Sequence, residues 1–252
     1  MYKPVRLSPA LTGMAIALAF AGAGITAHAH TTIRSQATES VTEDNAARIG
    51  HGCEASSGDN RPVIAQSVVF PTVSPILTAS DNSAVPNLAA VIEQGTLAGL
   101  VRGVQDRAIF QQQQIKRDAN GNAIGFSATY GMLDPSFQGR VPFQFVAPKF
   151  VASSCAKRLL VRIAIADICV RGTTDSVRPG KVNLWIPANG SDYATQAQQY
   201  SVDGVGSPAT LTVNRNLTTN PLPASCGAGI DVTVTPNPVD VDTNLPIPGF
   251  WK

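Results

Sequence analysis

Short apolar runs with a two-residue period recur along the chain and predict β-strands. In RLLVRIAIADICV, residues 158–170, every second residue from Leu159 to Ile165 is a branched aliphatic residue. This spacing puts one apolar face on an extended strand. VPFQFVAP, residues 141–148, alternates in the same way. Further strands are expected in RPVIAQSVVFPTV, KVNLWIP, ATLTVNR and IDVTVTP.

Two segments have a different pattern. In AIFQQQQIKRDANGNAIGFSATYG, Asn120-Gly121 lies between two extended runs, which predicts a β-hairpin. Residues 87–104, NLAAVIEQGTLAGLVRGV, have helical spacing, although Gly95, Gly99 and Gly103 weaken a helix there.

The pattern and the composition together favour an all-β fold. Charged residues make up only 14% of the chain, whereas glycine and proline occur 21 and 18 times, as in short strands joined by turns. We expect a single immunoglobulin-like β-sandwich domain over residues 30–252. It should carry a long, partly helical insertion at about residues 76–130 and an extended tail after residue 188.

The first 29 residues resemble a secretory signal peptide. Lys3 and Arg6 precede the apolar run ALTGMAIALAFAGAGI, which contains glycines and is short for a membrane span. The small residues of Ala27-His28-Ala29 predict cleavage after Ala29, which leaves His30 as the first mature residue. Cleavage after Ala27 would instead leave His28 first. The mature chain is expected to be periplasmic or secreted, with no membrane span.

Charge excludes some partners of the mature chain. The whole sequence has 19 Lys and Arg against 17 Asp and Glu, and removal of Lys3 and Arg6 makes the two numbers equal. A formally neutral chain gives no support to nucleic-acid binding or to attraction by an anionic membrane.

Four cysteines remain after cleavage, and an even number in an exported protein favours two disulfides. They are Cys53, Cys155, Cys169 and Cys226, and three pairings are possible. Their spacing lacks the C-x-x-C pattern of a zinc or cluster site.

Enzymatic motifs are scarce. G-x-S-x-G, H-E-x-x-H and the P-loop pattern are absent, and two mature histidines leave no credible Ser-His-Asp arrangement. Met132 is the only methionine after cleavage, which excludes a methionine-rich Cu(I) store.

A histidine at a free N-terminus has metal chemistry of its own. Its α-amine, with an ordinary pKa of about 7.7–8.0, and its near ring nitrogen close a chelate ring. Sites built from nitrogen donors prefer Cu(II) among the divalent first-row metals. His30 is therefore a candidate copper ligand.

Several segments together resemble the YcnI-like family of exported bacterial copper-binding domains. They are HTTI at the expected mature start, RIGHGCEASSGDNRPVIAQSVVFP, VPFQFVAP, LLVRIAIADICVRG and KVNLWIP. The resemblance covers most of residues 30–187. It implies a Cu(II) site of one-histidine-brace type, with His30 as the ligand residue and Trp185 beside the metal.

The same resemblance implies a disulfide pairing and a departure from the family. It pairs Cys53 with Cys169, which leaves Cys155 with Cys226. The family's glutamate ligand falls at Arg140, whose guanidinium would repel copper, so a glutamate restored there should tighten binding. Other acids that could replace the missing ligand are Asp134, Glu39 and Glu43.

His51, in the His-Gly-Cys step, has two interpretations. It completes a two-histidine copper site with His30, or it orders the loop before the disulfide. The main functional hypothesis is a non-catalytic protein that holds Cu(II) in copper trafficking or homeostasis. Its expected partners are the copper ion and another periplasmic copper carrier. The alternatives are a histidine-brace copper monooxygenase acting on polysaccharide and a structural or adhesive sandwich without metal.

Overall fold

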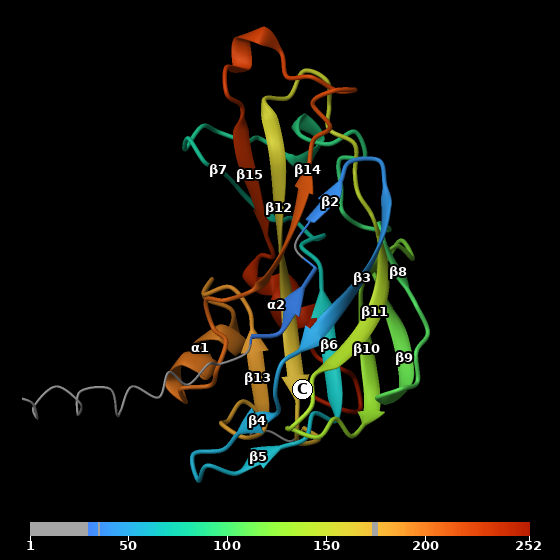
Figure 1. The fold of residues 1–252 in the computed structure, drawn as a ribbon. Helices are drawn as coiled ribbons and strands as arrows, with labels where there is room; N and C mark the ends of the chain where they lie inside the picture. Colours follow the sequence, from blue (N-terminus) through green and yellow to red (C-terminus); the bar gives the residue numbers. More distant parts are fainter. Residues whose placement is uncertain (1–29, 35, 173–175) are drawn as a thin grey trace, which may run out of the picture.

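The computed structural model describes residues 30–34, 36–172 and 176–252, so the expected signal peptide lies outside the described residues. Two β-sheets pack face to face in the all-β, immunoglobulin-like sandwich expected from the sequence (Figure 1). The smaller sheet has, in order, β1 (Thr32–Ile33), β3 (Thr42–Ile49), β11 (Gly139–Val146) and β8 (Val101–Gly103).

The larger sheet has nine strands. Its main order is β2 (Gln36–Thr38), β14 (Ala209–Asn214), β12 (Ala156–Ile168), β6 (Ala65–Val69), β10 (Ala123–Gly131) and β9 (Phe110–Arg117). Three further strands are β13 (Val182–Trp185) and β15 (Ile230–Thr235), which pair with β12, and β7 (Ile76–Ala79), which pairs with β15. A separate two-stranded ribbon joins β4 (Cys53–Glu54) to β5 (Asn60–Arg61).

Strand β12 is the central strand of the larger sheet. Its first half pairs with β14 and β15, and its second half pairs with β6 and β13. The predicted apolar face, from Leu159 to Ile165, is fully buried against the smaller sheet, where Phe143 and Phe145 of β11 belong to the same cluster. The two-residue period of this segment therefore forms the sandwich core, as expected.

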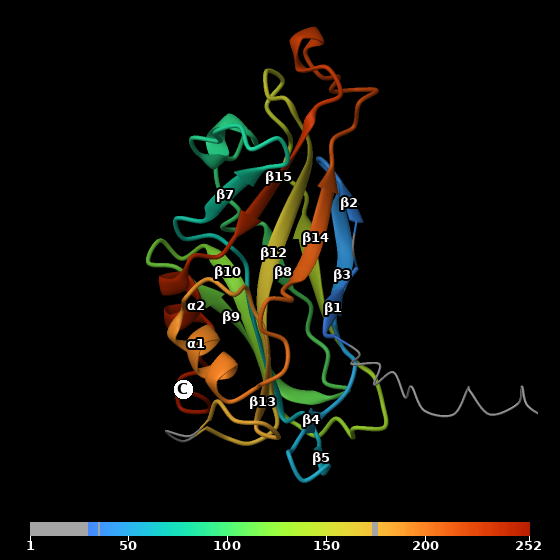
Figure 2. The ribbon, with the colours of Figure 1, turned by 90° about the vertical axis from the view of Figure 1, so that its left-hand side faces the viewer.

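The other face of β12 is buried too, but by helices. Figure 2 shows α1 (Asp192–Gln199) and α2 (Pro238–Asn244) on one side of β12 and the smaller sheet on the other. Ala164, Ala166 and Ile168 pack in a second apolar cluster with residues of both helices. Burial on both faces explains why this end of the strand is apolar at nearly every position. No helix in the described part of the chain is long and apolar enough to cross a membrane.

The predicted hairpin is confirmed. β9 and β10 are antiparallel neighbours, and the Asp118 carboxylate accepts hydrogen bonds from the backbone N–H groups of Asn120 and Asn122 at 2.9 and 2.8 Å. A short polar side chain thus satisfies the backbone donors of the turn.

The prediction of a helix over residues 87–104 is wrong, because the helical segment is much shorter. Only one 3-10 turn forms, Leu88–Ala90, capped by the side chain of Asn87. Gly95 and Gly99 have φ angles of 64° and 83°, in the left-handed region that ends a right-handed helix. The expected insertion, residues 76–130, supplies β7, β8, β9 and β10, so it contributes strands to both sheets. The tail after residue 188 likewise supplies β14 and β15.

Both disulfides implied by the resemblance are present. Cys155 is bonded to Cys226 just before β12 begins, and Cys53 is bonded to Cys169 just after β12 ends. The two bridges therefore join opposite ends of the central strand to distant parts of the chain.

Candidate metal site

Trp185, one of the predicted site residues, lies in the sandwich core at the end of β13. Its partner across the strand pair is Ile165 of β12, and its side chain is 1% exposed. The neighbours Leu184 and Ile186 face the other way, into the cluster that the helices cover. Strand alternation thus directs the indole toward the smaller sheet and the N-terminal strand.

The indole N–H of Trp185 donates to a carboxylate that the sequence analysis did not single out. Oδ2 of Asp167 accepts this bond at 2.6 Å and also accepts one from the hydroxyl of Thr31. Oδ1 accepts a 2.7 Å bond from Nε2 of Gln66. Asp167 has no exposed surface. Burial raises the pKa of Asp167, and the three hydrogen bonds together with the nearby His51 oppose that rise.

Sequence could have pointed to Asp167. It continues the face of β12 that carries Leu159, Val161, Ile163 and Ile165, and it is the acidic residue in that alternation. A carboxylate on the apolar face of a predicted core strand must find hydrogen-bond donors inside the protein.

His30 lies directly against Trp185. The centroids of the two rings are 4.9 Å apart, with the ring planes inclined at 49°. His30 is exposed, whereas the next residue, Thr31, is 2% exposed and donates to Asp167. The predicted first residue of the mature chain is thus placed over an indole by the burial of the residue that follows it.

His51 contacts the same indole from a second segment. Its ring centroid lies 6.0 Å from that of Trp185, edge to face. Nδ1 of His51 is 2.5 Å from the carbonyl oxygen of Gly52, and Nε2 is 3.8 Å from Oδ2 of Asp203. The structure therefore brings His30, His51 and Trp185 together, although they are up to 155 positions apart in sequence.

The His-Gly-Cys step has a structural reason. A Cβ at Gly52 would lie 2.0 Å from the carbonyl oxygen of Arg61, so only glycine permits this approach. The Gly52 carbonyl also accepts a 3.2 Å bond from Nδ2 of Asn183 in β13. With Cys53 bonded to Cys169, these contacts fix the backbone beside His51.

Arg140 faces away from the sandwich core. It pairs with Arg48 of β3, which in turn pairs with Thr32 of β1, and both arginines are exposed. The next residue, Val141, is buried in the core. Arg140 therefore projects from the outer face of the smaller sheet, whereas Thr31 contacts Asp167 from the inner face.

The three acids considered as substitutes for the missing glutamate have other contacts. Glu39 accepts backbone bonds from Phe150 and Asn216 at 2.8 and 2.7 Å. Glu43 is paired with Arg34 at 3.9 Å. Asp134 is exposed and accepts from the backbone N–H of Ser136 in a turn. The acid bonded to Trp185 and to Thr31, the neighbour of His30, is Asp167 instead.

The side chains alone do not form a complete metal cluster. Within residues 30–34, 36–172 and 176–252, no group of three or more His, Cys, Asp and Glu side chains could hold a metal ion. Trp185 uses its indole N–H to bond Asp167, so it offers a ring face rather than a donor atom. A metal at this place would need the backbone amine that cleavage before His30 would create.

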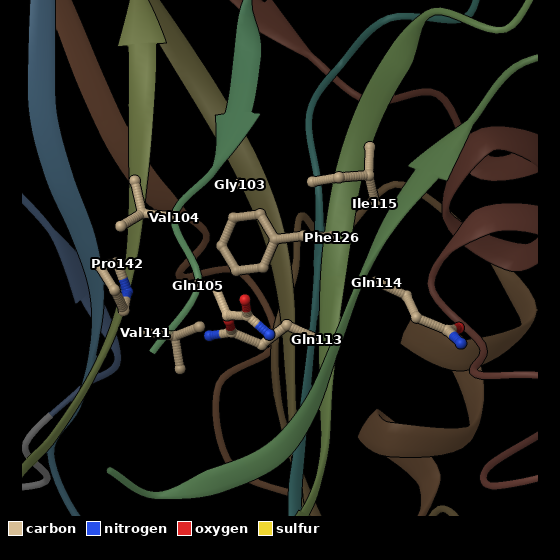
Figure 3. A pocket seen from close by; sticks show the side chains of 9 residues that line it. All are labelled: Gly103, Val104, Gln105, Gln113, Gln114, Ile115, Phe126, Val141 and Pro142. Atoms are coloured by element: carbon tan, nitrogen blue, oxygen red, sulfur yellow. The ribbon is translucent and has the colours of Figure 1, made fainter. Parts of the chain in front are cut away.

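The described part of the sandwich has hollows on its surface. One is beside His51 and is also lined by Glu54, Tyr200 and Asp203. Another is lined by Arg34, Arg48, Asp106 and Arg140. A further hollow, of about 160 Å³, lies between the edges of the two sheets, where Phe126 of β10 faces a gap between β9 and β11 (Figure 3). Its lining has no ionisable side chain and shares no residue with the site around Trp185.

Comparison with known proteins adds little. No family model matches the chain, and no curated protein matches it. Among solved structures, it is similar to an uncharacterized protein from Nocardia farcinica, described as having an immunoglobulin-like fold. The identity is 14%, the TM-score is 0.35, and the match covers 71% of this chain and 92% of that one.

Proposed function

We propose that the protein is an exported copper-binding protein that holds Cu(II) at the amino group and imidazole of His30. Its role would be copper trafficking or homeostasis, with another periplasmic copper carrier as a partner. The observation that carries the proposal is the packing of the His30 ring on Trp185, with a 4.9 Å centroid separation, at the expected start of the mature chain.

The donor chemistry of His30 fits copper. Once residues 1–29 are removed, His30 supplies an amine and a ring nitrogen. Nitrogen donors favour Cu(II) over the other divalent first-row ions. The two donors belong to one residue, so chelation needs no further folding. The indole of Trp185 packs against the His30 imidazole and restricts the orientations of that ring.

An acidic residue also lies next to the residues that position His30. The Asp167 carboxylate accepts hydrogen bonds from Trp185 and Thr31, and it would attract a cation where it is ionised, although burial raises its pKa.

A second candidate function is supported by His51. Its contact with the indole that also touches His30 would suit a two-histidine copper site, as in a histidine-brace monooxygenase. An Nδ1 held by a backbone carbonyl is a common arrangement for an imidazole that binds metal through Nε2. The non-catalytic role needs only His30. Replacement of His51 distinguishes the two candidate functions, as described in the Discussion.

Cu(II) titration of two versions of the mature protein tests the proposal. One begins at His30, verified by intact mass, and the other has a single alanine before His30. We expect one tightly bound Cu(II) per native chain and a loss of at least about 100-fold in affinity after extension, since the amine is displaced from its ring. Both versions should unfold at the same temperature. Equal affinities would contradict the proposal and leave the metal-free structural sandwich.

A further inference from the structure

Asp167 joins three separate segments of the chain through one buried carboxylate. Its donors are Thr31 at the N-terminus, Gln66 of β6 and Trp185 of β13. The two oxygens have different partners: Oδ2 accepts from Thr31 and Trp185, whereas Oδ1 accepts from Gln66. One oxygen therefore contacts both residues that position His30, and the other anchors the carboxylate to the sheet.

Beyond Thr31, the N-terminal segment is held by the pairing of β1 with β3 and by two hydrogen bonds between the backbone of Arg34 and the side chain of Asn45. Strand β1 contributes two residues, Thr32 and Ile33, paired with Arg48 and Ala47 of β3. Terminal residues of a domain fray unless side chains or strand pairing hold them. The bond from Thr31 to Asp167 extends the ordered region to the residue adjacent to His30.

The strength of this attachment follows from the burial of Asp167, because leaving a buried acceptor without its donor costs more free energy than an ordinary hydrogen bond contributes. Because Asp167 is wholly buried, water cannot replace a lost donor, so Thr31 and Trp185 are held where the carboxylate needs them. His30 is attached to the first of these residues and packs on the second.

We infer that Asp167 is a positioning residue, which holds the first residue of the mature chain over Trp185 so that its amine and ring can capture a metal cation. This inference rests on the proposed function for the identity of the cation, Cu(II). It assigns the role of orienting the site to a residue that does not itself contact the metal.

The test compares two variants that each remove one donor from Asp167. Thr31→Val removes the bond to Oδ2 and preserves side-chain shape, while Gln66→Met removes the bond to Oδ1. Both replaced residues are buried, so their effects on stability should be similar. Only Thr31→Val should release the N-terminus.

Amide hydrogen exchange of Thr32 and Ile33 is measured first, in metal-free protein that begins at His30. We expect Thr31→Val to accelerate exchange at least about tenfold, since local opening of a terminal strand costs little free energy. Cu(II) titration follows, and there Thr31→Val should weaken binding about 10- to 100-fold, as loss of an outer-sphere partner does. Gln66→Met should change both quantities by less than about threefold.

Asp167→Asn provides a second arm, which should resemble Thr31→Val because it weakens the same bonds. If Thr31→Val and Gln66→Met behave alike in exchange and in copper affinity, the positioning role is refuted. If no variant and no native protein binds Cu(II), the proposed function fails. The exchange data then decide alone whether Asp167 orders the N-terminus.

Discussion

The indole N–H of Trp185 points at Oδ2 of Asp167 from a distance of 2.6 Å, and neither side chain has more than 1% of its surface exposed. Trp185 is thus a core residue and a residue of the candidate site at once. One edge of its ring system satisfies a buried carboxylate, and the ring also contacts His30 and His51. Its effects on stability and on copper binding can be separated.

Trp185→Phe keeps an aromatic ring beneath His30 but removes the N–H. We expect the free energy of unfolding to fall by about 1–3 kcal/mol beyond the loss of packing, because Asp167 loses a donor that water cannot replace. Cu(II) affinity should change less than it does on N-terminal extension. Urea unfolding and Cu(II) titration measure the two effects.

Trp251→Phe is the matched control. Trp251 is also 1% exposed, but its indole nitrogen is buried without a hydrogen-bond partner among the described residues. This variant loses packing alone. An equal loss of stability in the two variants would show that the bond from Trp185 to Asp167 contributes nothing.

His51→Gln distinguishes a one-histidine from a two-histidine site. We expect Cu(II) affinity to fall by less than about threefold, because Nε2 of His51, the nitrogen that would bind the metal, lies 3.8 Å from Oδ2 of Asp203. The control is His30→Gln, which should abolish tight binding. A loss near 100-fold in His51→Gln would instead favour the two-histidine site of a monooxygenase.

Local pattern predicted the strands well. The alternation in β12 and β11, and the Asn120-Gly121 turn, depend on neighbouring residues, so a sequence contains them directly. The prediction of a helix over residues 87–104 was wrong, also for a local reason, since Gly95 and Gly99 adopt positive φ angles. The low helix propensity of glycine in this segment outweighed the helical spacing of its apolar residues.

The site was harder to predict because its parts meet only in three dimensions. His30 and Trp185 were named from chemistry and resemblance, but their contact depends on where β1 and β13 end. Asp167 carried a signal, an acid on an apolar strand face, yet its donors come from three segments. Arg140 could not be oriented until the register of β11 was known.

Lys116 predicts how stability depends on pH. Burial lowers its pKa to about 8, although Nζ donates to the carbonyl oxygens of Asn244 and Pro246 at 2.7 and 2.6 Å. In the unfolded chain the pKa is about 10.4. Between these values the unfolded state binds more protons, so the free energy of unfolding should rise with pH.

The rise from pH 8 to 10 should be about 1–2 kcal/mol, which is less than the full shift implies because Lys116 is partly exposed and its carbonyl partners favour the charged form. Lys116→Met should remove the rise in urea unfolding experiments across this range. Lys149→Met, at an exposed lysine paired with Glu93, should retain it. A native slope that is flat or negative would contradict the lowered pKa.

The two disulfides should contribute similarly to stability but differently to the site. Each closes a long loop, with sequence separations of 116 and 71, so removal of either should cost about 4 kcal/mol by releasing the unfolded chain. Cys53 and Cys169 each lie two residues from a site residue, His51 and Asp167 respectively. Cys155 and Cys226 lie at the opposite end of β12.

Replacement of both cysteines of one bridge by serine compares the two. We expect the Cys53/Cys169 variant to weaken Cu(II) binding about tenfold and to increase amide exchange around His51, because the bridge fixes the end of β12 two residues after Asp167 as well as the loop that carries His51. The Cys155/Cys226 variant should keep native copper affinity at a similar loss of unfolding free energy. Should both variants lose copper affinity equally, general stability would account for the effect, and the position of the Cys53–Cys169 bridge beside the site would have no functional consequence.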